Sequence, residues 1–166
     1  MTKGAEQLVQ TLDKESEIYS ELLDLARQKR DIVRAQNIQV DVLEKIINHE
    51  QGLVVSLFKL EELREKVVDK IMRDERIEFV ENVTQLVQLM RHEDRKHILE
   101  SKNRLLTLVK NVADESRFNN KMIEDKLEMI NLNIELMTGL GIDAGNYDRK
   151  AENKDGERKN LFDVRV

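Results

Sequence analysis

Apolar residues recur along most of the chain at intervals of three and four positions, the spacing of one face of an α-helix. Between Ala5 and Ala35 this spacing is unbroken, and it predicts a first helix over residues 5–36. The apolar positions of this segment are Leu8, Leu12, Ile18, Tyr19, Leu22, Leu23, Leu25, Ala26, Ile32 and Val33.

The pattern pauses around Asn37 and resumes as a heptad repeat, which predicts a second helix over residues 38–74, about 55 Å long at 1.5 Å per residue. Its start is predicted either at Asn37 or at a capping box from Asp41 to Glu44. Two polar residues, Glu50 and Arg64, occupy positions of the apolar seam. We expect the other seam residues to be buried against the first helix and the last long helix: Leu43, Ile46, Leu57, Leu60, Val67 and Ile71.

The polar run at residues 73–76 is followed by a change of apolar phase, which predicts a turn near 74–78 and a short helix over 79–90. A last long helix is expected over 93–139, where Gly139 and Gly141 end it. The predicted fold is all-α, an elongated antiparallel bundle of three long helices plus a short helix, with coiled-coil-like packing. We expect residues 1–141 to form this one domain and residues 142–166, rich in charge and poor in apolar residues, to form a mobile C-terminal tail.

The composition of the chain argues against nucleic-acid binding, disulfide bonds, secretion and membrane insertion. The net charge is −5, so no overall positive field is present to attract nucleic acid. Cysteine is absent, which excludes disulfides and is compatible with a reducing compartment. The N-terminal residues form no secretory signal, and no apolar stretch approaches the ~18 residues of a membrane span. We therefore expect a cytoplasmic protein without nucleic-acid binding or membrane insertion.

The chain lacks the residue spacings of a catalytic or metal site. A di-iron bundle needs Glu-x-x-His pairs, and none of His49, His92 and His97 has a Glu three residues before it. His92 and His97 are five residues apart, so their side chains point about 140° apart on a helix and do not share one metal. We expect no enzyme, no cofactor and no metal, solvated positions at a helix start for His92 and His97, and a flank position beside the seam for His49.

A basic cluster at Arg27, Lys29 and Arg30 raises the alternative of a phosphate-binding patch. Asp24 and Asp31 flank it at helical spacing, so local ion pairs along the helix are expected to satisfy it. The predicted role of this cluster is a solvated helix face.

Residues 127–137 depart from the one-faced pattern, because their apolar side chains surround the predicted helix axis. Counted from Leu127 at 100° per residue, the others are spread from about 140° to about 340°. The end of a thin bundle covers one side only, so the uncovered side predicts a binding surface for another protein. Methionine side chains adapt to varied partner shapes. The predicted protein-binding residues here are Met122, Leu127, Met129, Ile130, Leu132, Ile134, Leu136 and Met137.

Two other classes of function stay open at this point. A heptad protein is also compatible with a structural or adaptor coiled-coil homodimer that has no client. Sedimentation over a dilution series separates such a dimer from a client-binding protein. A metal-dependent bundle enzyme would retain iron or zinc on purification, which elemental analysis detects.

The order of several segments resembles the FlgN-type flagellar export chaperones. The resemblance rests on residues 19–30, 42–51 and 63–67, and on Leu132-Asn133 and Leu136 leading to Asn146-Tyr147-Asp148. A charged tail that closes on an apolar segment completes it, so the resemblance covers nearly the whole chain.

This resemblance implies a cytoplasmic chaperone of the flagellar type III secretion pathway. Such proteins hold hook-associated (hook–filament junction) proteins, prevent their premature assembly and deliver them to the flagellar export apparatus. In the family, substrate binding resides in the last part of the final helix and in the tail. The resemblance therefore adds Tyr147, Leu161, Phe162 and Val164 to the predicted protein-binding residues.

Overall fold

A computed structural model describes residues 1–139, which form four helices and no strand. The three long helices are α1 (Lys3–Arg34), α2 (Val40–Glu75) and α4 (His92–Thr138), and the short one is α3 (Val83–Leu89). The predicted all-α fold of three long helices and one short helix is confirmed. Residues 140–166, which include the predicted stop at Gly141 and the predicted mobile tail, lie outside the described residues.

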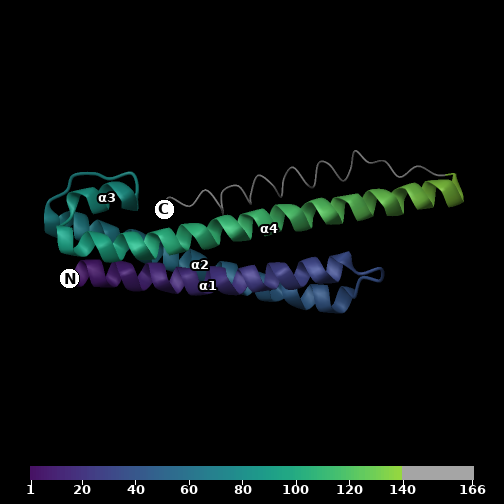
Figure 1. The fold of residues 1–166 in the computed structure, drawn as a ribbon, viewed down its shortest axis with the longest axis horizontal. Helices are drawn as coiled ribbons and strands as arrows, with labels where there is room; N and C mark the ends of the chain where they lie inside the picture. Colours follow the sequence, from purple (N-terminus) through teal and green to yellow (C-terminus); the bar gives the residue numbers. More distant parts are fainter. Residues whose placement is uncertain (140–166) are drawn as a thin grey trace.

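Helix α1 is the central element of the bundle. It packs against both α2 and α4, whereas the backbones of α2 and α4 come close to each other at few positions. Consecutive long helices are antiparallel, so α4 runs parallel to α1 (Figure 1). Two polar contacts fix α1 to α4 near both ends of α1: Thr2 donates to Asp94, and Lys126 donates to the carbonyl oxygen of Ala35.

The connection between α1 and α2 differs from the predicted one. Helix α2 begins at Val40 after the N-cap residue Gln39, whose side chain makes no capping bond. Both predicted starts, Asn37 and the capping box from Asp41 to Glu44, are therefore wrong. The Asp41 carboxylate lies in the first turn, where it interacts favourably with the positive end of the helix dipole.

The turn after α2 lies where the polar run predicted it. Arg76 adopts the left-handed conformation at φ 57°, and the N–H of Ile77 donates to the carbonyl oxygen of Met72 at 2.8 Å. This pairing satisfies a carbonyl at the helix end in the manner of a helix C-cap.

Helix α3 is shorter than the predicted 79–90. The side chain of Asn82 accepts a bond from the N–H of Gln85 at 3.0 Å, and this N-cap starts the helix only at Val83. Arg95 of α4 donates to the carbonyl oxygens of Met90 and Gln88, which satisfies the C-terminal end of the short helix and holds it on α4.

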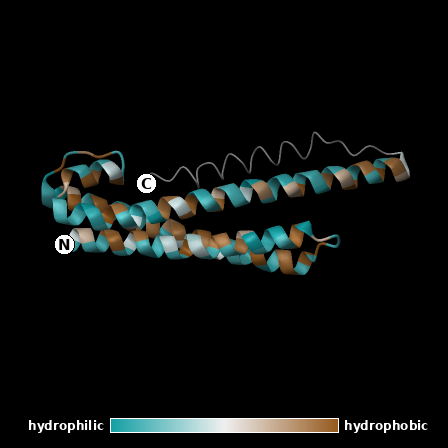
Figure 2. Cartoon of the chain, viewed as in Figure 1, coloured by the Kyte–Doolittle hydropathy of each residue, from teal (hydrophilic) through white to brown (hydrophobic). Residues whose placement is uncertain are grey.

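The core is aliphatic and follows α1 on both sides, as the brown positions along the paired helices indicate (Figure 2). Four of the six predicted seam residues are buried: Ile46, Leu57, Val67 and Ile71. The prediction is wrong for Leu43 and Leu60, which are half-buried. The buried residues of α2 and α4 belong to one core cluster, although the backbones of these two helices come close at few positions.

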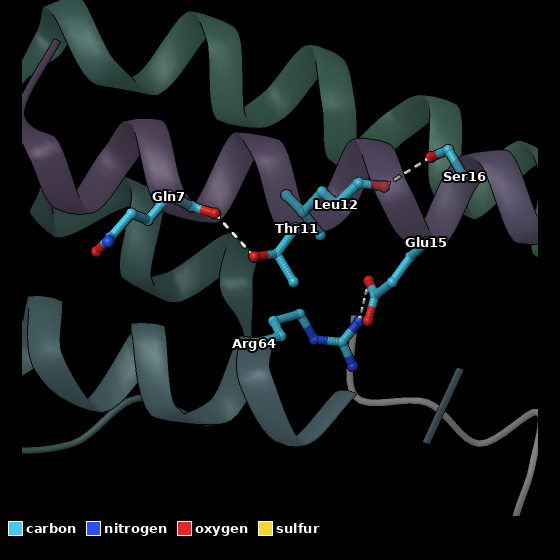
Figure 3. A network of polar contacts seen from close by, with 6 residues as sticks. All are labelled: Gln7, Thr11, Leu12, Glu15, Ser16 and Arg64. Carbon is cyan, nitrogen blue, oxygen red and sulfur yellow. Dashed lines mark hydrogen bonds and ion pairs between the residues drawn. The ribbon is translucent and has the colours of Figure 1, made fainter. Parts of the chain in front are cut away.

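The two polar seam residues of α2 pair with α1. Arg64 contacts Glu15 at 2.7 Å, as Figure 3 shows, and Glu50 contacts Lys29 at 2.7 Å. In both pairs the two residue numbers add to 79, so both belong to the same antiparallel register. Glu15 and Arg64 are 1% and 6% exposed.

Burial of the Glu15–Arg64 pair has a cost in desolvation. Burial raises the pKa of Glu15 to about 7, although the neighbouring Arg64 guanidinium lowers it. The charged form of Glu15 is therefore less favourable in the folded chain than in water, even with its counter-ion at hydrogen-bond distance.

Candidate protein-binding surface

The last twelve residues of α4, 127–138, form a surface that we call the α4 end. The last described bond between α4 and the α1–α2 hairpin joins Lys126 Nζ to the carbonyl oxygen of Ala35 at 2.8 Å. Beyond this bond α4 continues past the hairpin for about 18 Å at 1.5 Å per residue (Figure 1). The α4 end therefore has no helix of its own chain beside it among the described residues.

Gly139 ends the helix as the sequence predicted. It adopts the left-handed conformation at φ 67°, and its N–H donates to the carbonyl oxygen of Glu135 at 2.8 Å. A residue with a Cβ is strained in this conformation, so glycine suits the position.

The α4 end exposes large apolar side chains. Leu136 is 77% exposed and Met137 is 81% exposed, and the exposed set also includes Leu127, Met129, Ile130 and Leu132. Ile134 and, one turn before the α4 end, Met122 are half-buried. Seven of the eight predicted binding residues of the last helix thus lie together on the α4 end, and Met122 lies before it.

These side chains form two groups around the helix axis. Counted from Leu127, one group lies at about 140–200° and contains Met129, Leu132 and Leu136. The other lies at about 280–340° and contains Ile130, Ile134 and Met137. One neighbouring helix covers one face only, so a partner that buried both groups would have to contact the α4 end from two sides.

The charge of the α4 end is negative. Its charged residues are Glu128 and Glu135, and it contains no lysine or arginine. A partner with an apolar face flanked by basic side chains would match it in both hydrophobicity and charge.

The remaining predicted binding residues are not described. Tyr147, Leu161, Phe162 and Val164 lie outside the described residues, so their place relative to the α4 end stays a prediction.

The three histidines and the basic cluster were the candidate sites for metal or phosphate binding in the sequence. His49, His92 and His97 are exposed, as predicted, and no group of three metal-ligating side chains occurs within residues 1–139. The prediction of local ion pairs for the basic cluster is wrong, because Lys29 pairs with Glu50 of α2 and Arg30 pairs with Glu115 of α4. Lys29 therefore links α1 to α2, and Arg30 links α1 to α4.

A second apolar surface lies on α2, and the sequence gave no explicit prediction of it. Ile47, Val55 and Phe58 are exposed beside the buried seam. The available signal was the doubling of apolar positions at Ile46-Ile47 and Val54-Val55, which widens the stripe beyond what packing on one helix needs.

No helix within residues 1–139 is long and apolar enough to cross a membrane. Among known protein families, the model described as FlgN protein matches residues 1–155. No curated protein and no solved structure matches the chain.

Proposed function

The chain belongs to the FlgN protein family, and from this membership we propose that it is a cytoplasmic flagellar export chaperone whose clients are hook-associated proteins. Family membership supports the general role of a flagellar export chaperone. The finer role is to hold the hook–filament junction proteins, prevent their premature assembly and deliver them to the export apparatus.

The exposed apolar residues of the α4 end are the observation that carries this proposal. At ~25 cal/mol per Å² of apolar area, burial of a few hundred Å² contributes several kcal/mol before the costs of association. The client segment that fits is an amphipathic helix, whose apolar face covers Met129, Leu132 and Leu136 or the opposite group. Lysine or arginine beside that apolar face would complement Glu128 and Glu135.

Client binding is tested by calorimetry with a purified hook-associated protein and two single variants, Met129→Glu and Ile130→Glu. The two positions are adjacent in sequence but lie in different apolar groups, about 100° apart around the helix, so together they test both groups. At least one variant should weaken binding tenfold or more, while far-UV circular dichroism stays at the level of the parent chain. Phe79→Glu is the matched control, because Phe79 is 72% exposed and lies between α2 and α3, far along the chain from the α4 end.

The proposal would be overturned if both variants bound the client as tightly as the parent chain does. Tight self-association that is lost in the same variants, without any client binding, would favour the homodimer instead. Sedimentation velocity over a dilution series of the client-free chain distinguishes these two outcomes.

A further inference from the structure

A groove runs over α1 between α2 and α4, whose backbones lie farther from each other than from α1. It holds a cavity of about 430 Å³. Its lining comes from all three long helices, and seven of the fourteen lining residues are aliphatic, among them Leu22, Ala26, Val54, Val55 and Val112. Lys29 and Glu50 also line it, but they pair with each other at 2.7 Å, so the groove has little net charge to offer a partner.

Two buried polar atoms in the groove lining have no hydrogen-bond partner. They are the hydroxyl of Tyr19 and the Oδ1 atom of Asn119, on side chains of residues that are each 2% exposed. The other side-chain atom of Asn119, Nδ2, donates to the carbonyl oxygen of Ala26 at 2.8 Å. Buried polar atoms normally have protein or water partners, so an occupant of the groove can supply one acceptor for the hydroxyl and one donor for Oδ1.

We propose that the occupant is the segment of the same chain at residues 161–166, Leu-Phe-Asp-Val-Arg-Val. Its residues alternate in character. In an extended conformation Phe162, Val164 and Val166 lie on one face, and Asp163 and Arg165 lie on the other. The apolar face enters the groove, and the two charged side chains remain in water.

The backbone chemistry of the groove favours an extended segment over a helix. A helix satisfies its own N–H and C=O groups internally, so it has none to offer to Tyr19 or Asn119. An extended segment has free backbone groups of both kinds. One carbonyl accepts from the Tyr19 hydroxyl, and one N–H donates to Asn119 Oδ1.

The dimensions of groove and segment agree. From Val112 to Asn120 the α4 wall rises about 12 Å. Residues 162–166 span about 13 Å when extended.

The connecting chain is also long enough to return to the groove. The groove is centred near Ser116, about 33 Å along α4 from its last residue, Thr138. The 23 residues from Gly139 to Leu161 reach at most about 76 Å, which is more than twice that distance.

Disulfide trapping tests the docking directly, because the chain contains no cysteine. In the full-length V55C/V164C variant, mild oxidation should form a disulfide within one molecule, identified by intact mass and peptide mapping. The control pair is V40C/V164C, since Val40 is also an exposed valine of α2 but lies about 22 Å from Val55 along the helix. We expect the V55C pair to form at least ten times faster than the V40C pair at the same protein concentration.

Equal rates for the two pairs would overturn the proposal, because they would indicate random encounters of the tail with α2. Disulfides formed only between molecules would also overturn it, in favour of a second copy as the occupant.

A second measurement works without cysteine. Removal of residues 161–166 should shift the amide resonances of groove residues such as Val54, Ala26 and Val112, and leave those at the α4 end unchanged. The control is the full-length charge swap D163K/R165E, which alters only the outward face and should leave the groove resonances in place. A spectrum unaffected by the truncation would contradict the docking. No client is present in either experiment, so a failure here is separate from a failure of the proposed client binding.

Discussion

Replacing Glu15 with leucine should destabilise the fold strongly, because it removes the carboxylate that is hydrogen-bonded to the buried guanidinium of Arg64. Arg64 is 6% exposed, and its described ion-pair contact is Glu15 at 2.7 Å. Loss of one partner from a buried ion pair costs about 3–5 kcal/mol. We expect a loss of this size for E15L in the free energy of unfolding, and a similar loss for R64L.

The double variant E15L/R64L should behave differently. Both positions belong to the apolar seam between α1 and α2, where leucine fits the heptad pattern. The raised pKa of Glu15 indicates that desolvation outweighs the attraction of Arg64 in the folded chain. The pair therefore adds little net stability, and its replacement by two leucines should be neutral or stabilising, by up to about 4 kcal/mol.

Urea unfolding at pH 8, followed by far-UV circular dichroism, measures all four chains under conditions that ionise Glu15. The reasoning predicts two strongly destabilised single variants and a double variant at least as stable as the parent. It would be refuted if E15L changed the free energy of unfolding by less than about 1 kcal/mol, or if the losses of the single variants simply added in the double variant.

Three further predictions concern the core, the hydrogen bonds from Thr2 to Asp94, and the dependence of stability on pH. Leu57→Ala should cost about 2–5 kcal/mol in thermal or urea unfolding, whereas Leu136→Ala on the exposed α4 end should change stability by less than about 0.5 kcal/mol; equal effects would contradict the assigned faces. Asp94→Ala should cost about 1–3 kcal/mol, because it leaves two donors at the start of α1 unpaired, while Glu93→Ala, at an exposed position, should have little effect. The pKa of Glu15 is about 7 in the folded chain and about 4.3 when unfolded, so the folded state binds more protons between these pH values. The free energy of unfolding should therefore fall by at most about 3 kcal/mol as pH rises from 4.5 to 7, and a pH series on E15Q should lack that slope.

The periodicity of apolar residues predicted the helices well, because burial of one face decides which residues each helix needs. It predicted their ends less well, since those depend on single capping bonds. Asn82 delays the start of α3 to Val83, and α2 starts without any side-chain cap. Periodicity also does not state how many neighbours a helix has, which is why Leu43 and Leu60 were expected to be more buried than they are.

The pairing of α1 with α2 was partly present in the sequence. Glu50 and Arg64 were recognised as polar seam residues, but their partners were not. Glu15 and Lys29 continue the seam of α1 at the same heptad spacing as its apolar residues, and each is opposite in charge to the residue that faces it. In a parallel alignment of the same positions Glu15 would meet Glu50 and Lys29 would meet Arg64, so the charges favour the antiparallel register over the parallel one.

The apolar residues of the α4 end have no evident role in folding. Helix α4 packs on α1, and adding residues to the end of a helix that is already formed costs little, whether or not their side chains are apolar. Beyond Lys126, no described contact makes the fold more stable with a leucine than with a glutamate. An apolar helix end that stability does not require exposes the chain to aggregation, so its presence needs another cause. The proposed client binding would supply one, and it predicts that substitutions between Leu127 and Met137 separate client affinity from stability, whereas substitutions along α1 change both.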